Sequence, residues 1–282
     1  MQTTDYAIRA MTGAEVEEAV GWAAAEGWNP GDQDASCFSS VDPEGFIGGF
    51  LGDRMIASIS VVNYDTAYAF LGFYIVHPDF RGQGYGYALW QAGMGHAGSR
   101  TVGLDGVVAE QENYTRSGFE YAYRNIRFGG VPKALAVPEA AFLKPLTAVS
   151  DELLAYDRTL FPAPRDRFLD AWISAPGHAG FTATREGVLA GYALVRPCRS
   201  GAKIGPLFAD DAAVARQLAA AAIDAAGGGE IFLDVPEPTA DAVALARELG
   251  LEPVFETARM YRGPAPDIDL GRVYGVTSFE LG

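Results

Sequence analysis

The chain has 282 residues, 49% of them hydrophobic, and a formal net charge of −15 at pH 7. That charge disfavours nucleic acid, whose phosphates require a basic surface, and fits a small cationic partner better. No stretch reaches the roughly 18 consecutive apolar residues of a membrane span, and the first residues lack the pattern of a signal peptide, so we expect a cytoplasmic protein without membrane contact.

Neither the cysteines nor the histidines form a metal-binding or disulfide pattern. Cys37 and Cys198 are the only cysteines and have no C-x-x-C spacing, which predicts two buried thiols in a reducing compartment. The three histidines are far apart, and no two share the i, i+4 spacing of metal ligands on a helix. We therefore expect no metal site.

The first elements along the chain are predicted by a capping box and by runs of apolar residues. Thr12 and Glu15 form the capping box of a helix that continues to about residue 25. Gly, Pro, Asn and Asp residues predict a loop over 26–37. The strands predicted next are 45–51, 55–64 and 69–76, the first two joined at Gly52-Asp53.

The most informative segment is a glycine loop, Arg81-Gly82-Gln83-Gly84-Tyr85-Gly86, which follows the strand 69–76 and precedes a helical pattern over 87–97. Its three glycines expose backbone N–H groups where a helix begins. Unpaired amides and the positive end of the helix dipole both attract anions at such a place. The segment therefore predicts a phosphate-binding loop.

The elements after this loop complete a first domain. A short strand, 101–104, ends at Asp105-Gly106, a helical stretch covers 110–117, and a strand covers 119–128. A linker with little periodicity runs from 129 to 145. We predict two domains, 1–135 and 136–282.

The second domain repeats the order of the first at an offset of about 132 residues. The turn at 52–54 returns at 185–187, Ser117-Gly118-Phe119-Glu120 returns as Leu249-Gly250-Leu251-Glu252, and Arg127-Phe128 returns as Arg259-Met260. A strand over 203–208, a helix over 211–226 and a strand over 230–235 lie between them. The glycine loop has no copy, because residues 213–218 contain no glycine. This predicts two scaffolds with one phosphate site.

Several phosphate loops contain such glycines, and two of them fit poorly. A nucleotide-triphosphate loop requires a Lys followed by Ser or Thr, and neither pair follows these glycines. The dinucleotide pattern G-x-G-x-x-G matches Gly82 and Gly84 but has Tyr87 at its third glycine, although Asp105 lies where a ribose-binding acid is expected. A nicotinamide-dependent oxidoreductase remains an alternative, as does a non-catalytic CoA-binding module.

A third pattern, Arg-x-x-Gly-x-Gly, is met by Arg81, Gly84 and Gly86 with Val76-His77-Pro78-Asp79 just upstream. Here the chain resembles the GCN5-related N-acetyltransferase (GNAT) family. Segments 204–210, 233–237, 259–261 and 273–276 resemble the C-terminal half of its two-domain YitH/HolE-type members. The resemblance implies an α/β (α+β) fold of tandem GNAT-like domains. Each domain would have a mixed, mostly antiparallel twisted sheet flanked by helices, and the second would be a degenerate copy that contributes to the acceptor pocket.

The resemblance also implies a site for acetyl-CoA as co-substrate. The amides of Gly82, Gln83, Gly84, Tyr85, Gly86 and Tyr87 would hold the pyrophosphate with Arg81, and the strand end Tyr74-Ile75-Val76 would pair with pantetheine like an added strand. Tyr114 stands where many members carry the acid that protonates the departing thiolate. Family members often have an Asn at the position of Val107, and Asn113 is the nearby candidate for that contact.

The implied reaction is direct transfer to a primary amine of a small molecule within a ternary complex. Such an amine is protonated at neutral pH and needs a base before it attacks. Asp105 is the best-placed base, with Glu110 and Glu112 as alternatives. Trp28 and Asp32, in the loop after the first helix, are candidate substrate contacts. From the second domain, Phe161, Arg165 and Arg167 are candidates to close the cleft, and we expect a monomer or homodimer.

Overall fold

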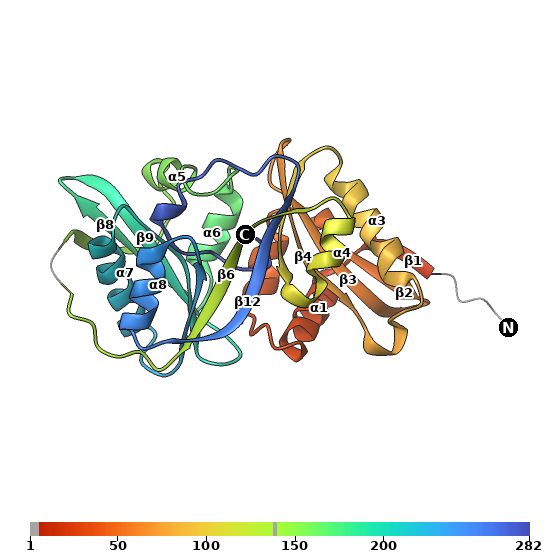
Figure 1. The fold of residues 1–282 in the computed structure, drawn as a ribbon, viewed down its shortest axis with the longest axis horizontal. Helices are drawn as coiled ribbons and strands as arrows, with labels where there is room; N and C mark the ends of the chain where they lie inside the picture. Colours follow the sequence, from red (N-terminus) through yellow and green to blue (C-terminus); the bar gives the residue numbers. More distant parts are fainter. Residues whose placement is uncertain (1–5, 138–139) are drawn as a thin grey trace.

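In the part of the chain that the computed structural model describes, residues 6–137 and 140–282, thirteen strands form one sheet with helices packed on its faces (Figure 1). None of the helices in these residues is long and apolar enough to cross a membrane.

The first half of the chain forms one end of the sheet (Figure 1). Its elements are β1 (Tyr6–Ala10), α1 (Gly13–Ala25), α2 (Asp34–Ser39), β2 (Phe46–Leu51), β3 (Arg54–Asn63), β4 (Tyr68–Val76), α3 (Tyr85–Ala97), β5 (Thr101–Val107), α4 (Gln111–Arg116) and β6 (Glu120–Gly130). The capping box predicted for α1 is confirmed, since the Thr12 side chain accepts from Glu15 N and Glu15 bonds back to Thr12 N. Two predictions were incomplete: α2 begins within the predicted loop 26–37, and β1 was not predicted.

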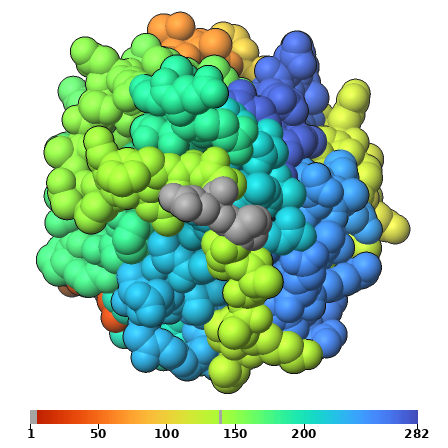
Figure 2. Space-filling model, turned by 90° about the vertical axis from the view of Figure 1, so that its left-hand side faces the viewer, coloured from red at the N-terminus to blue at the C-terminus, as the bar shows by residue number. Residues whose placement is uncertain are grey.

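The second half forms the other end and repeats much of this order. Its elements are β7 (Phe142–Leu146), α5 (Asp151–Asp157), α6 (Asp166–Ser174), β8 (Ala179–Arg185), β9 (Val188–Pro197), β10 (Ala202–Ala209), α7 (Ala212–Ala225), β11 (Ile231–Pro236), α8 (Ala240–Glu248), β12 (Glu252–Arg262) and β13 (Val273–Gly275). The predicted linker 129–145 was too long, because β6 extends into its start and β7 occupies its end. Residues 131–137 run over the surface of the second half (Figure 2), where Lys133 N donates to Leu249 O at 2.7 Å.

The two halves are joined by an exchange of strands. The sheet order is β1-β2-β3-β4-β5-β12-β6-β11-β10-β9-β8-β7, with β13 pairing β10 off this path. Strand β12 of the second half therefore lies beside β5 of the first, and β6 of the first half lies beside β11 of the second. The predicted boundary near residue 135 follows β6 along the chain, although β6 lies between two strands of the second half.

Buried ion pairs related by the sequence repeat connect the exchanged strands to their new neighbours. Arg127 on β6 binds Asp234 on β11, with Nε to Oδ1 at 2.6 Å. Its repeat partner Arg259 on β12 binds Asp105 on β5, with Nη2 to Oδ2 at 2.6 Å. All four side chains are buried, so removing one partner would leave a charge without compensation.

The last described residues run through the interior between the halves. After β13, residues 276–282 are buried, and the C-terminal label in Figure 1 lies between the two ends of the sheet. The Arg165 guanidinium donates to Thr277 Oγ1 at 2.8 Å, and the Tyr64 hydroxyl donates to Leu281 O at 2.8 Å. We call residues 276–282 the C-terminal segment. It contacts side chains from both halves.

Candidate active site

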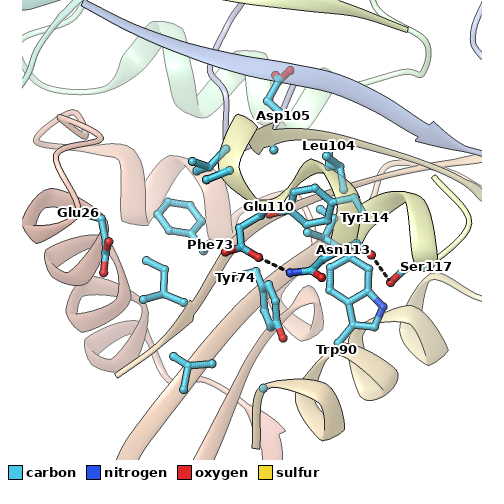
Figure 3. A pocket seen from close by; sticks show the side chains of 18 of the residues that line it. Glu26, Phe73, Tyr74, Trp90, Leu104, Asp105, Glu110, Asn113, Tyr114 and Ser117 are labelled. Carbon is cyan, nitrogen blue, oxygen red and sulfur yellow. Dashed lines mark hydrogen bonds between the residues drawn. The ribbon is translucent and has the colours of Figure 1, made fainter. Parts of the chain in front are cut away.

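A cavity of about 820 Å³ lies where β4 and β5 separate (Figure 3). The two strands pair in parallel only from Tyr68 to Leu71 and from Thr101 to Leu104. Beyond these residues β4 continues to Val76 and β5 to Val107 without pairing. The separation leaves one edge of β4 open toward the cavity.

A bulge in β4 explains why the strands separate. Phe73 has a φ of 46°, which is unusual for a residue with a side chain, and the register against β3 shifts between Ser58 and Ser60. The Ser58 hydroxyl donates to Phe73 O at 2.8 Å and so stabilises the bulge. Tyr74, Ile75 and Val76 follow the bulge and line the cavity, at the position where the sequence predicts pairing with pantetheine.

The glycine loop lies at one end of the cavity and forms the start of α3. Gly82 and Gly84 have φ values of 73° and 88°, which glycine adopts without strain, and Gly84 is the N-cap. A Cβ on Gly86 would lie 2.8 Å from Val76 Cγ2, so glycine lets α3 begin against β4. No side chain of the described residues caps this helix, so its first amides are available to an anion.

The other predicted loop residues divide into two groups. Tyr87 and Arg81 line the cavity with Gly82, Gly84 and Gly86. The side chains of Gln83 and Tyr85 point elsewhere: Gln83 Nε2 donates to Asp79 O at 3.0 Å, and the Tyr85 ring packs 4.8 Å from that of Tyr6. Neither residue is part of the cavity lining among the described residues, and the role of their backbone amides stays a prediction.

Arg81 holds the loop against its neighbours. Its Nε donates to Val76 O at 2.8 Å, and its Nη2 lies 2.6 Å from Glu26 Oε1 at the end of α1. The guanidinium thus bridges the end of β4 and the end of α1, and it remains about half exposed beside the cavity.

Tyr114 lies on α4 and faces the cavity between Trp90 and β5 (Figure 3). Its ring stacks on Trp90 with centroids 5.9 Å apart, and a Cβ on Gly106 would lie 2.3 Å from its Cε2. Burial raises the pKa of the Tyr114 hydroxyl above that of an ordinary phenol, so it stays protonated near neutral pH. Asn113 also lines the cavity, where its Nδ2 donates to Glu110 Oε2 at 2.6 Å.

Asp105 lines the cavity as predicted, but its carboxylate is already bound by three donors. Arg259 contributes Nε at 2.8 Å and Nη2 at 2.6 Å, and Asn125 Nδ2 donates at 2.7 Å. These contacts connect β5 to its neighbour β12 and, across β12, to β6. They occupy three of the roughly four lone-pair positions of the carboxylate, two on Oδ1 and one on Oδ2, and the role of Asp105 as base stays a prediction.

The predicted substrate contacts lie in different places. Trp28 lines the cavity, with its ring centroid 6.5 Å from that of Phe73. Asp32 is exposed and outside the cavity lining, because its loop is attached to the second half: Asp32 N donates to Pro197 O at 3.1 Å.

The three residues expected to close the cleft from the second domain do not line the cavity, so this expectation was wrong. Phe161 and Arg165 are buried in the core, where Arg165 binds Asp157 at 2.7 Å, and Arg167 is exposed.

The second half closes the cavity with residues that were not predicted: Phe255 and Thr257 of β12, and Phe279 and Glu280 of the C-terminal segment. Glu280 is 3% exposed and Thr257 is 2% exposed. Among residues 6–137 and 140–282, neither Glu280 Oε2 nor Thr257 Oγ1 has a hydrogen-bond partner. Local sequence carries no signal for this end of the cavity, because only the strand exchange brings these residues to β4 and β5.

The corresponding place in the second half is filled by the chain itself. Asp211 caps α7, with its Oδ1 accepting from Ala213 N and Val214 N at 3.0 Å each. Strand β13 pairs with β10, with Leu207 opposite Gly275, where the equivalent edge of β4 is open. The helix amides and the strand edge that are available in the first half are therefore both satisfied within the second.

Comparison with known proteins identifies both halves. Residues 13–119 match the model of the acetyltransferase (GNAT) family, and residues 153–275 match that of an acetyltransferase (GNAT) domain. The holothin acyltransferase of Pseudoalteromonas sp. (strain SANK 73390) is 34% identical over 93% of this chain and 89% of its own length.

Solved structures share the fold over nearly the whole chain. A Pyrococcus horikoshii protein assigned to the acetyltransferases superposes with a TM-score of 0.83 at 22% identity, covering 100% of this chain and 98% of its own. A tandem GNAT protein from the clavulanic acid biosynthesis pathway superposes with a TM-score of 0.62 at 17% identity, covering 93% and 100%. The chain belongs to the GCN5-related N-acetyltransferase family, carries two GNAT domains in tandem, and is an acyltransferase.

Proposed function

We propose that this enzyme moves an acetyl group from acetyl-CoA to a primary amine of a small molecule, by direct attack in a ternary complex. The observation that carries the proposal is the shape of the cavity, which runs from the uncapped N-terminus of α3 along the open edge of β4. An anion-binding helix end beside an unpaired strand suits a donor with a pyrophosphate and an amide-bearing arm.

Different groups of the chain would bind the donor, stabilise the oxyanion and donate a proton during acyl transfer. The amides of residues 82–87 would bind the pyrophosphate, and the open edge at Tyr74, Ile75 and Val76 would align the arm that follows. A backbone N–H near Val76 would stabilise the oxyanion that develops at the thioester carbonyl. The protonated phenol of Tyr114 would donate its proton to the departing thiolate.

The cysteines support direct transfer over a covalent acetyl-enzyme. Cys37 and Cys198 are buried, and neither is among the residues that line the cavity within the described chain. Burial raises the pKa of Cys37 to about 11, which leaves little nucleophilic thiolate at neutral pH.

A small-molecule acceptor is supported by the aromatic side chains of Trp28, Phe73, Phe255 and Phe279, which line the cavity. The 34%-identical relative is named for acylation of holothin, which also favours a small molecule. The carboxylate of Glu280 and the net charge of −15 favour an acceptor that arrives as a cation.

Calorimetric titration with acetyl-CoA and with NADH tests the donor. We expect saturable binding of acetyl-CoA and none of NADH; binding of NADH alone would support an oxidoreductase instead. Thiol release from acetyl-CoA in the presence of a panel of amines then separates an enzyme from a binding module, because a module would bind acetyl-CoA without releasing thiol.

A further inference from the structure

Glu280 combines three properties that rarely occur together unless a ligand completes the site. It is buried, its Oε2 has no hydrogen-bond partner among the described residues, and it lines the cavity. Burying a carboxylate without donors is costly, so native structures pair nearly all of them. Oε2 is itself shielded from solvent, so a donor that enters through the cavity would meet the carboxylate at its other oxygen, Oε1.

Packing fixes where along the cavity this carboxylate lies. A Cβ on Gly72 would lie 2.3 Å from Glu280 O, so the C-terminal segment touches β4 immediately before the bulge at Phe73. Gly72 is four residues before Val76, a separation of roughly 13 Å along a strand. Glu280 therefore belongs to the end of the cavity away from the glycine loop.

Two of the three cations around Glu280 are paired with other carboxylates, whereas the charge of Lys203 has no other carboxylate partner among the described ion pairs. Arg196 binds Asp34 at 2.9 Å and Arg127 binds Asp234 at 2.6 Å, while Lys203 Nζ donates to Asn29 O at 3.1 Å. Burial raises the pKa of Glu280, Asp34 adds to that rise, and Lys203, Arg127 and Arg196 oppose it. A carboxylate with a raised pKa accepts a proton more readily near neutral pH than an ordinary glutamate.

We propose that Glu280 of the second half binds the acceptor's ammonium group and removes its proton, so that the catalytic base comes from the domain that lacks the phosphate loop. The inference rests on the proposed acetyl transfer. Phe255, Phe279, Trp28 and Phe73 surround the same end of the cavity. The acceptor is therefore a small amine with an apolar or aromatic body and no anionic group.

In the proposed reaction the amine nitrogen loses two protons and the thioester sulfur gains one. One ammonium proton passes to the Glu280 carboxylate and then to solvent. The neutral nitrogen attacks the thioester carbonyl, the C–N bond forms, and the C–S bond breaks with its electron pair left on sulfur. Tyr114 protonates that sulfur, and the second proton lost by nitrogen restores the phenol.

The test compares two amines that differ in whether they need a base. Benzylamine is protonated at pH 7, whereas aniline is already neutral, and thiol release from acetyl-CoA is followed with each. For Glu280→Gln we expect kcat/KM to fall about 100-fold with benzylamine and less than about 5-fold with aniline. Acetyl-CoA affinity should stay within about 2-fold of wild type, since this residue is at the other end of the cavity.

Two further variants keep the test decisive. Glu280→Asp retains the charge but withdraws it by one methylene, so it should show the same selective loss if Glu280→Gln folds poorly. Glu252→Gln makes the matched change at an exposed glutamate on β12 and should leave both rates unchanged.

The outcomes separate this inference from the function on which it rests. If the wild-type enzyme binds acetyl-CoA but releases no thiol in the presence of any amine of the panel, the proposed function is refuted. Active wild-type enzyme with fully active Glu280 variants would overturn only the role of Glu280. Equal losses with both amines would also overturn it, because a carboxylate that only balances the charge of Lys203 would not distinguish them.

Discussion

Burial raises the pKa of both ionisable side chains that we place at the reaction, and the consequences differ because one is an acid and the other a base. Tyr114 becomes harder to ionise and remains a proton donor, whereas Glu280 becomes easier to protonate and is a better proton acceptor near neutral pH. Both shifts come mainly from the loss of water around the group. The same exclusion of water therefore keeps Tyr114 protonated and makes Glu280 a better proton acceptor.

Replacement of Tyr114 by Phe should lower kcat about 10- to 100-fold with little change in the KM for acetyl-CoA, because only the proton donor is lost. Steady-state thiol release measures this. Tyr121→Phe, at an exposed tyrosine on β6, is the control and should keep wild-type kcat. An unchanged kcat for Tyr114→Phe would assign protonation of the thiolate to water.

His178 gives a prediction for stability at acid pH. Burial lowers its pKa to about 4, helped by the charge of Arg196, while its Nδ1 lies 2.7 Å from Trp172 O. The unfolded chain binds this proton from about pH 6.5 and the folded chain only near pH 4, so stability is complete above 6.5 and falls as pH drops between them. We expect a loss of roughly 2–3 kcal/mol over this window.

Urea unfolding of wild type and His178→Gln at pH 7 and at pH 4.5 checks this contribution. The variant should be less sensitive to the change in pH than wild type. Equal sensitivity in the two proteins would mean that the fold does not lower the pKa of His178.

The N-termini of α3 and α7 differ in sequence although the two helices occupy equivalent places in the repeat. Both helices follow the corresponding strand of their half, but α3 begins at a bare glycine and α7 begins at Asp211, whose carboxylate binds its first amides. The phosphate loop was predictable because glycines at a helix start are a local signal. The filling of the second site by β13 was not, because it depends on contacts distant in sequence.

Two glycines of α3 provide a matched pair of substitutions. Gly84→Ala should destabilise the fold by about 1 kcal/mol, because its φ of 88° disfavours a side chain, and should weaken acetyl-CoA binding at least about 10-fold. Gly95→Ala, at an exposed position later in the helix with open space around it, should stabilise by about 0.5–1 kcal/mol without changing binding. Thermal unfolding and acetyl-CoA titration measure the two effects; equal affinities would remove the glycine loop from the donor site.

For the whole molecule, the exchange of β6 and β12 makes the two halves one folding unit. Each exchanged strand is held by a buried Arg–Asp pair, and neither half has its complete sheet without the other. We expect calorimetry to show one transition whose calorimetric and van 't Hoff enthalpies agree. Two resolved transitions would show that the halves unfold separately despite the shared sheet.

The exchange also explains which parts of the site the sequence could predict. The local glycine pattern predicted Gly84, and the family resemblance predicted Tyr74 and Tyr114; all three line the cavity. Asp105 was placed correctly on the wall, but its ion pair with Arg259 was not foreseen. Thr257 and Glu280 were not predicted as site residues, because their position depends on a long-range strand order that no local pattern encodes.

The residues that line the two ends of the cavity lie far apart along the chain. The glycine loop and Tyr114 come early, while Phe255, Thr257, Phe279 and Glu280 come more than a hundred residues later. The early part of the chain therefore carries the donor residues but only part of the acceptor end, Trp28 and Phe73. Chains truncated before residue 276 would lack Phe279 and Glu280, and we expect them to transfer nothing, because the acceptor end of the cavity would be incomplete.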